Sequence, residues 1–183
     1  MNLRDLWGLC SASDSQAAGG KKDQTATETS NPDVNRTSKK GVDVNLFPKD
    51  QDIYKYAKKI DNPLDDNVFV VGGHGAPSFM EDDSKQPISA RKLSELIKAD
   101  DNYQDGMSIL LVSCSTGKKD EGFAQKLADE MGLNTEVIAP TKTLWISSKG
   151  SLEVYDIVIT EDEKGNKVQT KEPGEWKTFT GRE

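Results

Sequence analysis

The chain has 183 residues, 34% of them hydrophobic, which suits one domain of ordinary size with a polar extension. Its formal net charge of −7 and its scattered lysines argue against nucleic acid as a partner, because phosphate binding depends on clustered Lys and Arg side chains. No run approaches the roughly eighteen apolar residues of a membrane span, and residues 1–10 have too short an apolar core for a signal peptide.

Residues 1–41 are predicted to form a flexible leader or linker. After residue 10 the only large aliphatic residue in this stretch is Val34, so little there can offset the entropy of ordering. Residues 1–10 are weakly amphipathic, which suggests either a local packing contact or a partner-binding helix. We therefore expect the folded domain to occupy residues 42–183.

The first predicted elements of the domain are a strand and a helix. Alternation of apolar and polar residues predicts a strand over residues 42–47, which Pro48 ends. A helix is expected from Asp50 or Gln51 to about Ile60, because apolar residues there recur at helical spacing.

Two short aliphatic runs each end at a reactive residue. Residues 68–71 lead into a Gly-Gly-His-Gly motif with the only histidine, His74, and residues 109–112 lead into Ser-Cys-Ser-Thr-Gly with Cys114. Such runs are typical of buried parallel strands. In an open α/β sheet the ligand crevice lies beyond the carboxyl ends of the strands, so both side chains are expected in one crevice.

Helices are predicted on either side of the strand that ends at Cys114. Residues 76–87 are predicted to be a polar loop, and Ser89 to be the N-cap of the helix that follows. Apolar residues at four-residue spacing predict a second helix over residues 123–131, ended by Gly132. We expect the N-terminal amides of this second helix to face the thiol.

The C-terminal part is predicted to be strands without helices. The fold class expected is therefore α/β, with a mostly parallel sheet and flanking helices in a three-layer sandwich, followed by a C-terminal β-hairpin region. The predicted strands are residues 135–139, 143–147, 152–160, 167–171 and 176–179, with a hairpin turn over residues 161–166.

His74 and Cys114 have the chemistry of a catalytic dyad. A cysteine is nucleophilic as the thiolate, and a nearby imidazole can take its proton. The glycines beside His74 allow the backbone to approach a substrate and direct amides at a developing oxyanion. The competing interpretation is structural, because a glycine-rich strand end can be a turn and a cysteine there is commonly a small buried hydrophobe.

A hydrophobic strand ending in His74-Gly75, then a helix, then a hydrophobic strand ending in Cys114 resembles the caspase, gingipain and clostripain superfamily of cysteine peptidases (clan CD). The nearest likeness is to the autoprocessing cysteine peptidase domains of large bacterial toxins and related toxin modules. The resemblance extends from about residue 42 to about residue 145. It implies a caspase-like fold, with His74 as general base or acid, Cys114 as nucleophile, and the amides of Gly75 and Cys114 as the oxyanion hole.

Further residues beside the two motifs are candidate supporting or substrate-binding groups. The carboxylates of the predicted loop, Glu81, Asp82 and Asp83, are candidates to orient His74, as a carboxylate does in catalytic triads. The competing interpretation is that they are solvated charges of a surface loop. The other candidates near the crevice are Gly73, Ser113, Ser115, Thr116 and Trp145.

By this resemblance we expect a cysteine-type endopeptidase of a bacterial toxin or secreted effector, which hydrolyses a peptide bond through an acyl-thioester. It would act on a protein or peptide in a reducing target-cell compartment, or otherwise in the cytoplasm, and an immunity or regulatory protein is a candidate partner. No cofactor or metal is expected, since one histidine gives no metal-ligand spacing. Two alternatives stay open: a non-catalytic caspase-like binding module, and a toxin domain that uses the dyad for another acyl transfer.

Two departures from the resembled families limit what carries over. Caspases have Gln-Ala-Cys-x-Gly where this chain has Ser-Cys-Ser-Thr-Gly, so specificity for aspartate is not implied. The toxin peptidases are activated by inositol hexakisphosphate bound to a basic cluster, whereas this chain is acidic. We therefore expect no activation by inositol hexakisphosphate.

Overall fold

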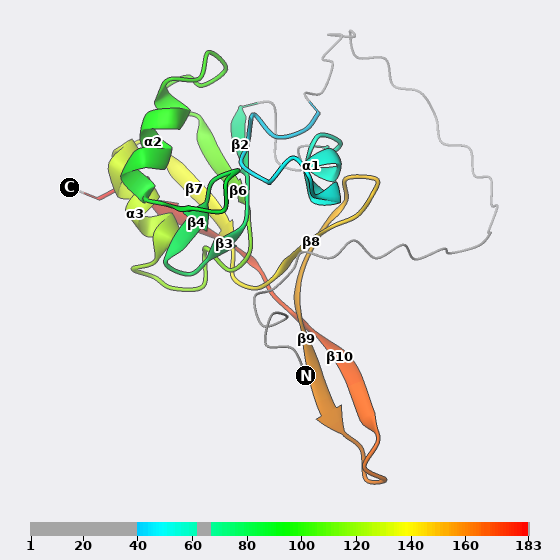
Figure 1. Ribbon diagram of the computed structural model, residues 1–183. Coiled ribbons are helices and arrows are strands. Elements are labelled where there is room, and N and C mark those ends of the chain that lie inside the picture. Colours follow the sequence, from blue (N-terminus) through cyan, green and yellow to red (C-terminus); the bar gives the residue numbers. More distant parts are fainter. Residues whose placement is uncertain (1–39, 62–66, 183) are drawn as a thin grey trace, which may run out of the picture.

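The centre of the computed structural model, which describes residues 40–61 and 67–182, is a five-stranded sheet with strand order β1-β2-β6-β7-β11 (Figure 1). The first four strands run parallel, and the last is antiparallel to its neighbour. The predicted α/β class with a mostly parallel sheet is therefore confirmed. The strands are β1 (Val44–Asn45), β2 (Val68–Gly72), β6 (Ser108–Val112), β7 (Glu136–Pro140) and β11 (Trp176–Thr180).

The two central strands explain why the sheet is covered on both faces. β2 is buried along its whole length, and in β6 only Ser108 is partly accessible. Successive side chains of a strand point to opposite faces, so a continuous aliphatic run places apolar groups on both. Phe69 and Ile109 pack in the apolar cluster on one face, whereas Val70 and Leu110 pack in the cluster on the other.

Helices α2 (Ala90–Lys98) and α3 (Phe123–Met131) cover the first of these faces and pack against each other (Figure 1). The second face is covered by α1 (Asp52–Ala57) and the short strand β8 (Leu144–Ile146). The expected three layers are thus present. One outer layer, however, combines a helix of fewer than two turns with a strand.

The helix boundaries follow the predicted caps in two of three cases. The Ser89 hydroxyl accepts a hydrogen bond from the Lys92 amide at 3.1 Å, which confirms Ser89 as the N-cap of α2. Gly132 ends α3 with a φ of 106°, a conformation that glycine adopts without strain. Helix α1 is shorter than expected and ends at Ala57 rather than near Ile60.

The predicted loop over residues 76–87 is wrong, because this segment forms a small three-stranded antiparallel sheet with order β3-β4-β5. Its strands are too short to show a period of two in the sequence. What holds the segment on the domain is Met80, which is fully buried in the same cluster as α2 and α3. The strands are β3 (Gly75–Ala76), β4 (Phe79–Glu81) and β5 (Pro87–Ile88).

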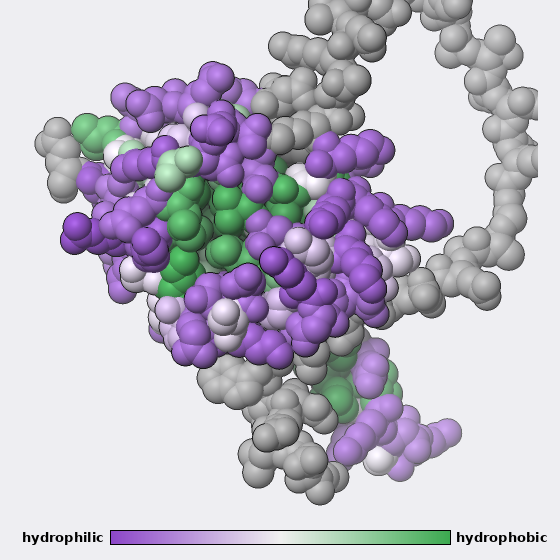
Figure 2. Space-filling model, turned by 45° about the horizontal axis from the view of Figure 1, so that its top comes forward, coloured by the Kyte–Doolittle hydropathy of each residue, from purple (hydrophilic) through white to green (hydrophobic). Residues whose placement is uncertain are grey.

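The C-terminal part contains strands without helices, as predicted. Strands β9 (Leu152–Glu161) and β10 (Lys167–Pro173) pair as a long antiparallel hairpin that projects from the body (Figure 1). The chain then returns through β11 to the main sheet. Figure 2 shows hydrophilic residues over most of the face in view, apolar residues in a central hollow, and further apolar surface on the hairpin, where Ile157 and Ile159 are exposed.

The predicted leader lies outside the described residues except for Lys40 and Gly41. The Gly41 amide donates to the Ile60 carbonyl at 2.7 Å, and a β-carbon on Gly41 would lie 2.9 Å from the carbonyl oxygen of Lys58. The packed part of the chain thus includes residue 41. Within the described residues no helix combines the length and the apolar character needed to cross a membrane.

Candidate active site

His74 and Cys114 occupy equivalent positions on two adjacent parallel strands. Gly72 of β2 is paired in register with Val112 of β6, and each reactive residue follows its paired residue by two positions. The pairing continues one step beyond the strands, since the Gly73 amide donates to the Val112 carbonyl at 3.1 Å. Adjacent strands lie about 4.8 Å apart, so the backbones of the two residues are neighbours.

The two side chains also lie on the same face of the sheet. Cys114 belongs to the apolar cluster that contains Phe47 and Leu144. The His74 ring meets the Phe47 ring edge to face, with 5.2 Å between the ring centroids and 87° between the planes. The expectation that the two strand ends bring imidazole and thiol into one region therefore agrees with the geometry.

The half-buried His74 ring is held by a neutral partner. Its Nε2 lies 2.6 Å from Oε1 of Gln51, the residue that precedes α1. Burial lowers the pKa of His74 below its ordinary value; the charge of Glu81 opposes this shift and the charge of Lys85 adds to it. The imidazole is therefore neutral at neutral pH, which is the form that can accept a proton.

Cys114 is 7% exposed, and its Sγ donates to the carbonyl of Leu144 at 3.8 Å. Nε2 of His74 bonds to Gln51, and the Cys114 thiol bonds to the Leu144 carbonyl. Catalytic hydrogen bonds are often long before substrate binds, so proximity on one face is compatible with proton transfer in a complex.

The amide of Gly75 points away from the small sheet. The Glu81 amide donates to the His74 carbonyl at 2.9 Å, and hydrogen-bonded pairs alternate along an antiparallel ladder. Gly75 and Met80 therefore form a non-hydrogen-bonded pair, which turns the Gly75 N–H away from β4. This orientation is the one that an oxyanion donor at Gly75 needs.

The predicted donors Ser113 and Thr116 are buried and bond to each other, with 2.7 Å between their hydroxyl oxygens. They lie behind Gly75, because a β-carbon there would be 3.1 Å from Cβ of Ser113 and 2.8 Å from Cγ2 of Thr116. Their hydroxyls thus support the backbone of the site rather than face the crevice.

Ser115, directly after Cys114, has a left-handed backbone with a φ of 55°, which is uncommon for a residue other than glycine. Its amide donates to the Lys142 carbonyl at 2.9 Å and its carbonyl accepts from the Lys118 amide at 3.1 Å. Residues held in this conformation cluster at functional sites, so the turn after the thiol is unlike an ordinary strand end.

The carboxylates of Asp82 and Asp83 do not contact His74. Asp82 accepts hydrogen bonds from the amides of Ser84 and Gln86, each at 2.9 Å, and so closes the turn between β4 and β5. The Asp83 carboxylate accepts a hydrogen bond from the Ser84 hydroxyl at 3.5 Å. The Glu81 side chain acts on the His74 imidazole through its charge. The expected orienting carboxylate is thus replaced by the Gln51 amide.

Gly73 and Trp145 contribute packing beside the site. A β-carbon on Gly73 would lie 3.0 Å from Cβ of Leu46, so a larger residue would require Leu46 to shift. Trp145 follows Leu144, the residue whose carbonyl accepts from Cys114, and stacks on Tyr155 with 5.2 Å between the ring centroids. The indole N–H donates to the Tyr155 carbonyl at 3.0 Å, so the ring is held in place.

The expectation that α3 directs its amides at the thiol is wrong. The amide of Phe123 donates to the Pro77 carbonyl at 3.0 Å, and that of Ala124 donates to the Thr116 carbonyl at 3.4 Å. In addition, α3 packs on the face of the sheet opposite to Cys114. Eight residues, 115–122, separate Cys114 from the start of the helix, enough chain to pass from one face to the other.

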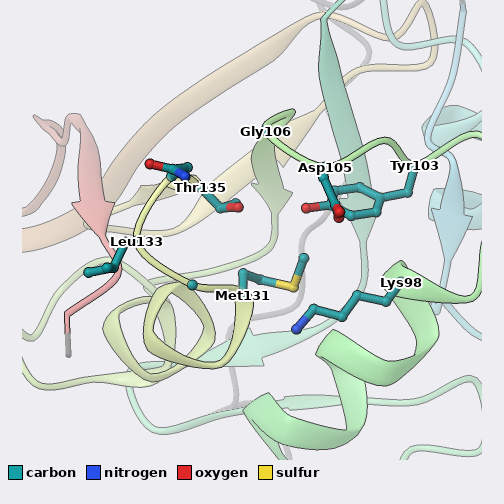
Figure 3. A pocket seen from close by; sticks show the side chains of 9 residues that line it. Lys98, Tyr103, Asp105, Gly106, Met131, Leu133 and Thr135 are labelled. Atoms are coloured by element: carbon teal, nitrogen blue, oxygen red, sulfur yellow. The ribbon is translucent and has the colours of Figure 1, made fainter.

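A cavity of about 570 Å³ lies at the other end of the sheet. Figure 3 shows Lys98 of α2 and Met131 of α3 on one side of it, with Tyr103 and Asp105 from the segment before β6 opposite. Since β6 starts beside this cavity and ends beside Cys114, the cavity is separate from the dyad. Among residues 40–61 and 67–182, no three His, Cys, Asp or Glu side chains are grouped to hold a metal ion.

Gln51 is the site residue that sequence reasoning missed. Its position at the start of α1 was expected, but not its contact with a ring 23 residues along the chain. One signal was present: glutamine is not among the residues that favour an N-cap.

Comparison with known proteins places these residues in a family. Residues 42–154 match the family described as "Domain of unknown function (DUF8616)", a range that includes Gln51, His74, Cys114 and Trp145. The chain is also 42% identical over 94 residues to the uncharacterized protein YibJ of Escherichia coli (strain K12), a bacterial relative. That alignment covers 51% of this chain and 39% of YibJ, so the chain spans about two fifths of its relative's length. The chain belongs to the DUF8616 family.

Proposed function

We propose that this domain is a cysteine-type endopeptidase in which Cys114 is the nucleophile and His74 the general base and acid. The observation that carries the proposal is the equivalent placement of the two residues beyond paired strands, on one face of the sheet. The resemblance to clan CD peptidases at the two strand ends supports the same assignment.

In the first half of the reaction, His74 takes the thiol proton and the Cys114 sulfur attacks the carbonyl carbon of the peptide bond. The C–N bond then breaks, the imidazolium gives its proton to the leaving amine, and an acyl-thioester remains. In the second half His74 takes a proton from water, the hydroxide attacks the thioester, and the C–S bond breaks to release a carboxylic acid and the thiol.

The oxyanion formed in each half needs donors that are already oriented. The outward-turned amide of Gly75 supplies one donor, and the amide of Cys114 is assigned as the second. A single donor of this kind is worth about 10²–10³-fold in rate. The buried Ser113 and Thr116 side chains, whose hydroxyls bond to each other, pack behind Gly75 through their carbon atoms and restrain its backbone.

The likeness of the two strand-end motifs to toxin peptidases supports a role in a toxin or secreted effector. The Escherichia coli relative adds only that a bacterium carries a similar chain. The substrate would be a protein or peptide in the reducing interior of a target cell, where Cys114 stays a thiol. An immunity or regulatory protein would be the natural partner of such a domain.

One observation favours a second function, that of a non-catalytic binding module. Cys114 is 7% exposed and its Sγ donates to the Leu144 carbonyl. A buried thiol with a carbonyl acceptor is also what a purely structural cysteine would show.

The deciding experiment compares the wild-type protein with Cys114→Ala after incubation with bacterial and host lysates. New peptide N-termini, found by mass spectrometry with wild-type protein alone, are expected for a peptidase. Selective alkylation of Cys114 over Cys10 near neutral pH is expected as well. Identical N-termini in both samples and sluggish alkylation of both thiols would favour the binding module.

A further inference from the structure

We propose that Gln51 is the positioning residue of His74: its side-chain oxygen accepts the Nε2 proton, which leaves Nδ1 as the basic nitrogen. The two atoms lie 2.6 Å apart. A neutral imidazole carries one proton, so a ring that donates from Nε2 can accept only at Nδ1. The assignment of the two ring nitrogens does not depend on any activity. The role of Nδ1 as the catalytic base rests on the proposed function.

The place of Gln51 in the fold supports a role other than capping. Gln51 is the N-cap of α1, with φ −95° and ψ 143°, but its side chain makes no cap hydrogen bond. Asn, Asp, Ser and Thr are the residues that cap well. The side chain therefore leaves the helix end without a cap and bonds to His74 instead.

The backbone of Gln51 is fixed independently of its side chain. Its amide donates to the Pro48 carbonyl at 3.1 Å, and its carbonyl accepts from the Tyr54 amide at 3.1 Å. The side chain thus extends from an anchored turn. Together with Phe47, which meets the ring edge to face, it restrains both the plane of the imidazole and the direction of its Nε2–H bond.

A neutral acceptor suits a buried base. A carboxylate in the place of Gln51 would favour the imidazolium and raise the pKa of His74. The amide fixes the tautomer and the ring orientation without adding a charge. The charged or titratable groups around the ring are then Glu81 of β4, Lys85 of the following turn and the Cys114 thiol at the end of β6.

The chain allows a direct test, because His74 is its only histidine. Untagged protein labelled with ¹⁵N gives one imidazole spin system, whose two nitrogen shifts report the tautomer. We expect Nε2–H in the wild-type protein. A free neutral imidazole already favours Nε2–H in water, so the readout is the environment of that N–H as well as the tautomer. In Gln51→Asn the side chain is one methylene shorter, so we expect the Nε2 shift to move toward that of a free neutral imidazole and the Nε2–H proton to exchange faster with water. A predominant Nδ1–H tautomer in the wild-type protein, or an unchanged spectrum in Gln51→Asn, would overturn the proposal.

Gln51→Asn also separates positioning from stability. Asparagine is a good N-cap, so the thermal midpoint of this variant is expected to be equal to or above that of the wild type. Gln104→Ala is the matched control, since Gln104 is exposed and precedes β6 at the other end of the sheet. It should leave the midpoint, the imidazole shifts and the turnover unchanged.

The kinetic consequence is measured on a peptide cleaved by the wild-type protein. Misplacement of the base predicts a fall in kcat of about 10²-fold in Gln51→Asn, with little change in KM. In Gln51→Glu the acceptor is kept and a negative charge is added. The pKa that governs the acidic limb of the pH–rate profile should therefore rise by about one unit or more. An unmoved limb together with full kcat in Gln51→Asn would refute the positioning role.

The two proposals fail in different ways. A wild-type Nε2–H signal whose shift and slow exchange with water are lost in Gln51→Asn supports the Gln51 assignment whatever the peptidase assays show. Absence of cleavage by the wild-type protein would count against the proposed function alone.

Discussion

Gly75 packs so closely against Thr116 that a β-carbon on Gly75 would lie 2.8 Å from the Thr116 methyl carbon. The same β-carbon would lie 3.3 Å from the carbonyl oxygen of Cys114. The residue after the candidate base is thus in contact with the turn that carries the candidate nucleophile. Any displacement of Gly75 moves its outward-facing amide relative to the thiol.

Gly75→Ala is therefore expected to impair both activity and stability. Overpacking of this kind costs about 1–3 kcal/mol, and the shift of the amide should lower kcat by about 10²-fold. Ser78→Ala is a suitable control, because Ser78 is exposed in the turn between β3 and β4. Chemical denaturation and steady-state kinetics of the two variants check the prediction. An unaltered kcat in Gly75→Ala would remove Gly75 from the oxyanion hole.

His74→Ala and Cys114→Ala should each abolish turnover while the domain stays folded, because both residues follow strands rather than fill them. Each loss is expected to be about 10⁴-fold or more, and the double variant should be about as inactive as either single variant. Circular dichroism and single-turnover assays provide the measurements. If turnover of the double variant fell by the product of the two single losses, the residues would not act as one unit.

The part of the fold that the sequence predicts well is set by local patterns. The aliphatic runs of β2 and β6 predict buried parallel strands at the correct positions. Ser89 predicts the start of α2, and Gly132 the end of α3. In each case the residues that carry the pattern are part of the predicted element or adjoin it in sequence. The prediction therefore needs no knowledge of the tertiary fold.

What the sequence does not predict depends on contacts between distant segments. Met80 belongs to a strand of three residues, too short for periodicity, and its burial requires α2 and α3 to be in place. The two strand ends in the sequence predict that His74 and Cys114 lie close together. They do not predict which residue orients His74. The nearby acids Asp82 and Asp83 are occupied in their own turn, whereas Gln51 reaches His74 only after α1 packs on the sheet.

Burial of His74 predicts a specific loss of stability in acid. Burial lowers the pKa of His74 in the folded state, so the unfolded chain binds this proton more readily. The neutral imidazole contributes fully to the free energy of unfolding above about pH 6.5, the ordinary pKa of histidine. This contribution is lost as the pH falls from that value toward the pKa of His74 in the folded protein. Between about pH 8 and about pH 5, the urea midpoint should fall further in the wild-type protein than in His74→Gln. Equal falls in the two proteins would contradict the buried neutral state.

A hexaphosphate site could be assembled only if four lysines met around the C-terminal hairpin: Lys118, Lys119, Lys142 and Lys149. In the structure, three of the four lie beside carboxylates or in a different region. Lys142 forms an ion pair with Glu172 at 2.8 Å. Burial raises the pKa of Asp156, but hydrogen bonds from Thr143 and the charges of Lys142 and Lys118 outweigh it and hold the pKa below its usual range. Lys149 belongs to a different region, the turn after β8 that packs beside Lys59 at the end of α1.

Inositol hexakisphosphate is therefore expected neither to stabilise nor to activate the domain at micromolar concentration. A hexaphosphate needs several converging cations to offset its own repulsion and desolvation, and here two of the lysines lie beside carboxylates. Isothermal titration calorimetry with wild-type protein and Lys142→Ala, together with the melting midpoint of each, tests this expectation. A tight, saturable heat and a raised midpoint that Lys142→Ala abolishes would contradict it. Control of the dyad would then resemble that of the toxin peptidases. If no heat is seen, we expect control by a partner protein or by the upstream chain occupying the crevice.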